Sequence, residues 1–315
     1  MQPNELNPRT IQLLSTEDHS IAIITSKNIR HRRFALRIQQ EFGKNVVAWF
    51  QLDSSFSYKA TKSQAIHSES RGQNLKKQIL EYLSYTKLRG LFKIPGKLFY
   101  FIRDRLALRK HYAKTLKTEV LLFEEEVKEL EQYKLIDPIT VHPMQINSKE
   151  FINKLNGLKP YFLLTLGGPL FKNALFENVR GLAINQHAGH SPEYKGGDTI
   201  ERALYKRDLN KISSTVHLLS SGADSGSIIR RSQVNIFPKD SVNHLFLKVV
   251  ALGTELIIEI VKDCISKKEV TVFDQPDFYG ETLLSTDITG EDIRRISKDL
   301  QSKWIPKQLK KIRGY

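Results

Sequence analysis

A run of consecutive apolar residues near the start of the chain is the strongest constraint on the fold. The segment Ser20–Ser26 contains four apolar residues in succession, Ile21–Ile24, which is typical of a strand buried on both faces. A helix is predicted next, from Ile29 to about Phe42, and a second apolar strand follows at Val46–Leu52. This strand–helix–strand order is by default a right-handed βαβ unit, so we expect a parallel sheet.

The strand pattern stops after this unit, and residues 54–130 are predicted to form a helical insertion. The stretch that follows Pro95 and Gly96 is long enough for about five helical turns. Thirteen lysines and arginines but only two acidic residues, Glu81 and Asp104, lie within residues 71–117. This segment therefore carries a formal net charge of +11 out of the +15 of the whole chain.

The alternation of strands and helices resumes after the insertion. We expect strands near 135–141 and 161–168, a helix at 149–158, a β-hairpin formed by 213–220 and 227–236, and an amphipathic helix at 241–265. Asp198 is predicted to cap a short helix that ends near Arg207, and Thr289 is predicted to cap a helix from Gly290 to about Leu300.

These elements predict an α/β, Rossmann-like architecture with a mostly parallel sheet and a β-hairpin. The predicted parts are a first βαβ part (1–53), the basic helical insertion (54–130), a second part that carries the candidate site (131–266) and a short C-terminal helical tail (267–315).

A single cysteine, Cys264, excludes an internal disulfide, and it also excludes a metal site built on several thiolates. It is predicted to lie on the core face of a helix. The N-terminal residues lack a signal-peptide pattern, and no window approaches the roughly 18 apolar residues of a membrane span. We therefore expect a cytoplasmic protein.

The loop Asn185–Gly197 holds the densest collection of chemically able side chains, and it leaves the end of an apolar strand. Open parallel sheets bind ligands beyond the carboxyl ends of their strands. Asn185 and His187 are two residues apart in an extended chain, so their side chains share one face and can converge on one ligand atom.

Three short patterns in this order resemble the folate-dependent formyltransferases: Asn185-x-His187, then Ser191-Pro-x-Tyr-Lys-Gly196, then Ala223-Asp-x-Gly226. The resemblance spans roughly residues 20–265. That family includes glycinamide ribonucleotide transformylase, methionyl-tRNA formyltransferase and sugar N-formyltransferases. The resemblance implies a Rossmann-like formyltransferase fold and 10-formyltetrahydrofolate as co-substrate, and it implies no metal.

Roles for individual residues follow from the same resemblance. Asn185 and His187 would donate hydrogen bonds to the oxyanion that forms when an amine attacks the formyl carbon, and His187 would also exchange protons. Asp224 would orient His187 or a water molecule. The predicted folate contacts are Gly167, Gly168, Leu170, Ser221 and Ala223, and the predicted acceptor contacts are His190, Tyr194 and Lys195. His217 is interpreted as a strand residue of the hairpin.

The identity of the acceptor is left open, because Ala188, Gly189 and Lys195 depart from the residues found in better-known members. We expect a small, phosphorylated or nucleotide-linked acceptor, foremost an amino sugar of the kind used in polysaccharide biosynthesis. Methionyl-tRNA is disfavoured, because only about fifty residues follow Ile265 and they resemble helices more than a β-rich domain.

Two alternatives differ in class from the leading hypothesis. A formyltetrahydrofolate hydrolase would use water as acceptor, and a non-catalytic protein would dock on membrane or RNA through the basic insertion. The charges of residues 71–117, with Phe92, Phe99, Tyr100 and Phe101, suit a solvated helix face, an anionic acceptor or a membrane surface. Nucleic acid is the least expected partner, and a homo-oligomer is left open.

Overall fold

The computed structural model describes residues 7–53, 94–276, 280–284 and 287–302, together with Trp304, Lys307 and Gln308. The strands of the main sheet are β1 (Pro8–Gln12), β2 (Ile21–Thr25), β3 (Val46–Leu52), β4 (Ile139–Val141), β5 (Phe162–Leu166), β6 (Leu182–His187), β8 (Ser213–Leu218), β9 (Ile228–Gln233) and β10 (Glu269–Phe273). A separate two-stranded sheet pairs β7 (Tyr194–Gly196) with β11 (Glu281–Leu283). The helices are α1 (Ile29–Phe42), α3 (Ile94–Leu130), α4 (Lys149–Leu158), α5 (Asn173–Phe176), α6 (Thr199–Tyr205), α7 (Val242–Lys267) and α8 (Gly290–Gln301).

The main sheet has a parallel part and an antiparallel part. The strand order is β1-β10-β9-β8-β6-β5-β2-β3-β4, and the pairs from β6 to β4 are parallel. The pairs from β6 to β1 are antiparallel, beginning with β6–β8 and the hairpin β8–β9. The predicted α/β class, the first βαβ unit and the hairpin are therefore confirmed.

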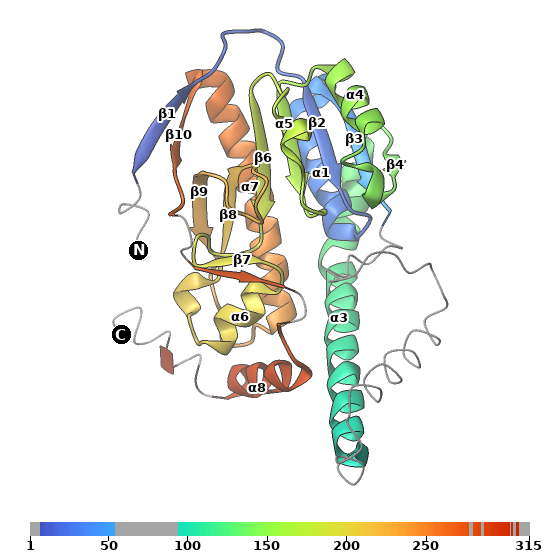
Figure 1. Cartoon of the computed structure of the whole chain (residues 1–315), viewed down its shortest axis with the longest axis vertical. Helices are drawn as coiled ribbons and strands as arrows, with labels where there is room; N and C mark the ends of the chain where they lie inside the picture. The colour runs from blue at the N-terminus through green and yellow to red at the C-terminus, as the bar shows by residue number, and fades with distance from the viewer. Residues whose placement is uncertain are drawn as a thin grey trace.

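Helices cover both faces of the parallel strands (Figure 1). On β2, Ile21 and Ile23 belong to the core that includes α1 and α7, whereas Ala22 and Ile24 belong to the core that includes α4 and α5. Successive side chains of a strand point to opposite faces, so a strand covered on both sides must be apolar at every position. This explains the consecutive apolar run in the sequence.

Helix α3 is the longest element and lies beside the body of the molecule (Figure 1). Val127 and Leu130 near its C-terminal end pack with Leu36 of α1, and α3 also contacts α7 and α8. The helix is longer than predicted, because it begins before Pro95 and continues through the acidic segment to Leu130. The predicted contributions of residues 54–93 to the insertion, including Phe92, lie outside the described residues.

The part of α3 after residue 98 exposes both apolar and basic side chains. Phe99 and Tyr100 are each 61% exposed, and Leu106 is 57% exposed. None of the helices described here is long and apolar enough to span a bilayer. Docking of this helix on a membrane or an anionic acceptor stays a prediction.

Two predictions about the ends of the chain are wrong in detail. Strand β1 precedes the first predicted element and pairs with β10. The tail after residue 266 was expected to be helical, yet it supplies β10 to the main sheet and β11 to the small one. These strands are short and pair with residues that are distant in the sequence. Local periodicity therefore does not indicate them.

The two predicted helix caps have different outcomes. Thr289 forms a capping box with Asp292 at the start of α8, as predicted. Asp198 precedes α6 but makes no capping hydrogen bond, because its backbone is left-handed (φ 50°) and its carboxylate turns to Tyr112 of α3. The predicted burial of Cys264 on a core face is confirmed, since it lies in α7 and is 2% exposed.

Candidate active site

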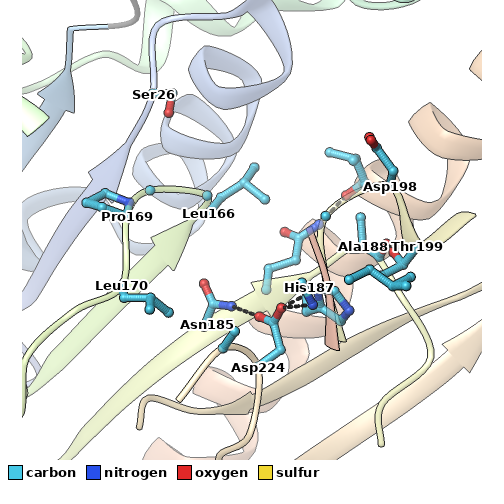
Figure 2. Close-up of a pocket in the computed structure, with 18 of the residues that line it drawn as sticks. Ser26, Leu166, Pro169, Leu170, Asn185, His187, Ala188, Asp198, Thr199 and Asp224 are labelled. Carbon is cyan, nitrogen blue, oxygen red and sulfur yellow. Dashed lines mark hydrogen bonds and ion pairs between the residues drawn. The ribbon is translucent and has the colours of Figure 1, made fainter. Parts of the chain in front are cut away.

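A cavity of about 710 Å³ lies where β2, β5 and β6 end. Its walls come from these strand ends, the first turn of α1, one face of α3, the start of α6, the loop after β8 and the residues around β11. This size is within the range of about 300–1,000 Å³ that is usual for small-molecule sites. Figure 2 shows Asn185, His187 and Asp224 joined by hydrogen bonds and ion pairs on one side of the cavity, with Asp198 apart from them.

Asn185 is held in a fixed orientation at the end of β6. Its Oδ1 accepts a hydrogen bond from Thr165 Oγ1 on β5 (2.7 Å). Its Nδ2 then points to two polar side chains of the cavity wall, 3.2 Å from Asp224 Oδ1 and 3.1 Å from His217 Nε2. The neighbouring parallel strand thus decides which way the amide points.

His187 is buried, and both of its ring nitrogens face hydrogen-bond acceptors. Nε2 donates to the carbonyl oxygen of Tyr194 (2.9 Å), and Nδ1 lies 3.1 Å from Asp224 Oδ2. Burial lowers the pKa of His187, whereas the charge of Asp224 acts in the opposite direction. A neutral ring can donate to only one of these partners, so a second proton on the ring is stabilised by Asp224.

Asp224 is the hub of the group. Its Oδ2 accepts a hydrogen bond from the Gly196 backbone N–H (2.8 Å) and faces His187, while its Oδ1 faces Asn185 and His217. Burial alone would raise the pKa of this carboxyl, but the neighbouring histidines and the hydrogen bonds outweigh burial and hold its pKa well below the usual range. The carboxylate therefore stays ionised.

His217 is a fourth member of the group, and the sequence interpretation missed its role. It lies opposite Asn185 in the antiparallel β6–β8 register. Its Nδ1 donates to the carbonyl oxygen of Leu218 (2.8 Å), and its Nε2 lies 3.3 Å from Asp224 Oδ1. The register of a hairpin strand against β6 was the missing information, since a histidine at that position must face the asparagine.

The loop that carries Asp224 is braced by the C-terminal tail. Gln275 Nε2 donates to the backbone carbonyls of Asp224 (2.8 Å) and Gly226 (2.6 Å). Asp224 itself has a left-handed backbone (φ 47°). No local pattern pointed to Gln275, because its contact depends on β10 joining the main sheet.

Four of the five predicted folate contacts line the cavity, namely Gly167, Gly168, Leu170 and Ala223, whereas Ser221 does not. Gly167 and Gly168 have positive φ angles of 70° and 126°. A Cβ at Gly168 would lie 2.9 Å from the ring of Phe171. The turn therefore requires glycine at Gly168.

The three predicted acceptor contacts are not brought to the cavity wall. His190 is bonded to Ser213 and lies beside Glu193, and burial lowers its pKa to about 2. The hydroxyl of Tyr194 donates to Asp208. Both Tyr194 and Lys195 belong to β7, and both residues are buried. These residues hold the loop in place, and Tyr194 acts on the site through its backbone carbonyl.

Among the described residues, no group of three or more histidine, cysteine, aspartate or glutamate side chains is arranged to bind a metal ion.

The part of the chain that carries the site is similar in sequence to known proteins. Residues 109–261 match the sequence model of the formyl transferase family. A methionyl-tRNA formyltransferase from Kosmotoga olearia is 31% identical over 158 residues, which cover 50% of this chain and 50% of that protein. The chain spans about half the length of the curated relatives that it matches.

Two solved structures are similar over most of the chain. A 4-N formyltransferase from Francisella tularensis is 16% identical with a TM-score of 0.47, covering 86% of this chain and 78% of that one. A phosphoribosylglycinamide formyltransferase from Anaplasma phagocytophilum is 13% identical with a TM-score of 0.46, covering 80% and 88%. The sequence match begins in α3 and ends in α7, so it includes Asn185, His187 and Asp224.

Proposed function

We propose that this chain, a relative of the folate-dependent formyltransferases as its sequence indicated, transfers a formyl group from 10-formyltetrahydrofolate to the amine of a small acceptor. The observation that carries the proposal is the bonded group of Asn185, His187, His217 and Asp224 in the wall of one cavity. Formyl transfer requires a hydrogen-bond donor to the oxyanion and a side chain that can accept and release protons, and this group contains both.

Asn185 is the residue proposed to bind the formyl oxygen. Its Nδ2 carries two hydrogens, which are directed at Asp224 and His217. A formyl oxygen that gains negative charge is a stronger acceptor than the His217 ring, so it would take over one of these hydrogens. The Thr165 hydroxyl keeps the amide from rotating away.

His187 is proposed to carry protons, and the ionised Asp224 is proposed to stabilise its protonated ring. The attacking ammonium must lose two protons in all, and the departing folate nitrogen must gain one, so one proton is released for each formyl group transferred. A ring held between a carboxylate and a carbonyl can accept a proton and pass it on. Because both ring nitrogens of His187 already have partners, we assign proton transfer to His187 and leave oxyanion binding to Asn185.

The folate is proposed to lie against the turn Gly167–Leu170 and the loop at Ala223. These residues line the cavity, and the exposed side chain of Leu170 offers an apolar surface. For the acceptor, a nucleotide-linked amino sugar stays the first candidate, on the basis of the sequence resemblance.

The test is incubation with 10-formyltetrahydrofolate and a panel of nucleotide-linked and free amino sugars, with tetrahydrofolate and formylated product measured together. We expect equal amounts of both products with at least one acceptor. Tetrahydrofolate formed without an acceptor would identify a hydrolase instead. Failure to form tetrahydrofolate under either condition would contradict the proposal.

A further inference from the structure

One wall of the cavity joins α3 to the start of α6 through two adjacent polar pairs. The Tyr112 hydroxyl donates to Asp198 Oδ2 (2.8 Å), and His111 Nε2 lies 3.0 Å from Glu201 Oε1. Tyr112, Asp198 and Glu201 all line the cavity. Each carboxylate uses one oxygen in these pairs, so the other oxygen can receive a ligand.

His31 of α1 also lines the cavity, on the side of Leu166 and Gly167. It is 4% exposed, and its Nδ1 has no hydrogen-bond partner within the described part of the chain. Its ring also interacts with the backbone carbonyl of Leu166, and burial holds its pKa well below the usual range. Since a carbonyl can only accept, the single ring proton belongs to Nε2, and Nδ1 is a buried acceptor without a partner.

The positive charge in this wall is already neutralised. Arg30 lines the cavity, but Glu119 of α3 accepts hydrogen bonds from both its backbone N–H (2.5 Å) and its Nη1 (2.6 Å). The Glu119 side chain is 1% exposed and the Arg30 side chain 19%, so their opposite charges offset each other within the wall. The wall therefore presents hydrogen-bond acceptors and negative charge to a ligand, which favours a ligand that donates hydrogen bonds and carries positive charge.

We propose that this wall, defined by Tyr112, Asp198 and Glu201, is an ammonium subsite that receives the primary ammonium group of the acceptor. The inference rests on the proposed function and deepens it by naming the feature of the acceptor that is recognised. It also gives the predicted insertion a role, because α3 supplies Tyr112 and fixes both carboxylates.

The subsite is connected to the reacting group by a short stretch of chain. Gly196 N–H donates to Asp224, and Thr199 Oγ1 donates to the carbonyl oxygen of Ala188 (2.5 Å) beside His187. Asp198 lies between these two anchors. An amine held at Asp198 thus shares the cavity with the group that receives its protons (Figure 2).

The charge of the subsite depends on pH. Burial and the charge of Glu201 raise the pKa of Asp198 to about 7, while Tyr112 and His111 act against this rise and Asp287 adds to it. Ammonium binding is expected to strengthen as pH rises through 7, where Asp198 becomes ionised, and to weaken below it.

The test measures binding directly, without formyl transfer. The probe is 1,3-diaminopropane, compared with the neutral 1,3-propanediol, by titration calorimetry at pH 6 and pH 8. We expect the diamine to bind at least tenfold more tightly than the diol at pH 8, and Asp198→Asn to weaken the diamine at least tenfold, about 1.4 kcal/mol. Tyr112→Phe should weaken it less, and the control Asp240→Asn, on a loop outside the cavity, should leave it unchanged.

Binding of 5-formyltetrahydrofolate by each variant shows that the fold and the folate site are intact. Equal affinity of the wild type for diamine and diol, or unchanged diamine affinity in folded Asp198→Asn, would overturn the inference. These outcomes are separate from those of the proposed function. A protein that binds the diamine through Asp198 but forms no tetrahydrofolate would retain the subsite and lose the proposed reaction.

Discussion

Replacement of Asp224 by asparagine tests the hub of the site with a side chain of the same size. The native carboxylate meets four nitrogen atoms, those of Gly196 (2.8 Å), His187 (3.1 Å), Asn185 (3.2 Å) and His217 (3.3 Å), two at each oxygen. An amide has only one oxygen. Whichever way it is oriented, its NH₂ group must face an N–H donor, that of Gly196 on one side or that of Asn185 on the other.

The magnitude follows from these four contacts. At least one of these hydrogen bonds is lost, and a hydrogen bond to a charged group contributes about 1.5–3 kcal/mol. The free energy of unfolding should therefore fall by about 1.5–3 kcal/mol, and the 15% exposure of the side chain favours the lower part of this range. His187 loses the charge that favours its protonated form, so kcat for formyl transfer should fall at least hundredfold.

Urea denaturation followed by circular dichroism measures the first effect, and steady-state formation of tetrahydrofolate measures the second. The matched control is Asp274→Asn, which alters a carboxylate that is 56% exposed and bonded to Arg9 and Ser227. The control should lower the free energy of unfolding by less than about 1 kcal/mol and leave kcat unchanged. An Asp224→Asn protein with kcat within threefold of wild type and unchanged stability would refute the reasoning.

Three further predictions concern residues around the site. The folded-state pKa of His190, about 2, lies below its unfolded value of about 6.5. The free energy of unfolding should therefore be highest above pH 6.5 and fall by about 1.4 kcal/mol per pH unit below it. His190→Gln should flatten the pH dependence of the melting temperature, and an unchanged slope would contradict this. Glu119→Ala should cost about 3 kcal/mol in urea denaturation, because it leaves Arg30 unpaired and releases α3 from α1; a loss below 1 kcal/mol would show that the pair does not anchor α3. Gly189→Ala should lower kcat at least tenfold, since a Cβ there overlaps His187 Nε2 and lies 2.7 Å from Thr199 Oγ1; wild-type kinetics would disprove the crowding.

Local periodicity was sufficient for the elements that are buried on a regular face. The apolar runs at β2 and β3 and the helical spacing of α1 and α7 each determine one element and the side that it buries. The convergence of Asn185 and His187 could also be predicted, because alternate residues of one strand share a face.

Features that depend on distant pairing could not be predicted in this way. His217 faces Asn185 only because β8 is antiparallel to β6 in one particular register. Gln275 reaches the Asp224 loop only because β10 crosses into the main sheet. Asp198 had the sequence of a helix cap, but the hydroxyl of Tyr112, 86 positions away, bonds its carboxylate instead.

The most direct test of the account is the formyl-transfer rate of His187→Ala, measured in a single turnover with 10-formyltetrahydrofolate and an acceptor found in the panel. Retained binding of 5-formyltetrahydrofolate would show that the cavity is intact. The account predicts a rate at least a hundredfold below wild type, because no other described residue places an ionisable ring between Asp224 and the Tyr194 carbonyl. A rate within threefold of wild type would contradict it.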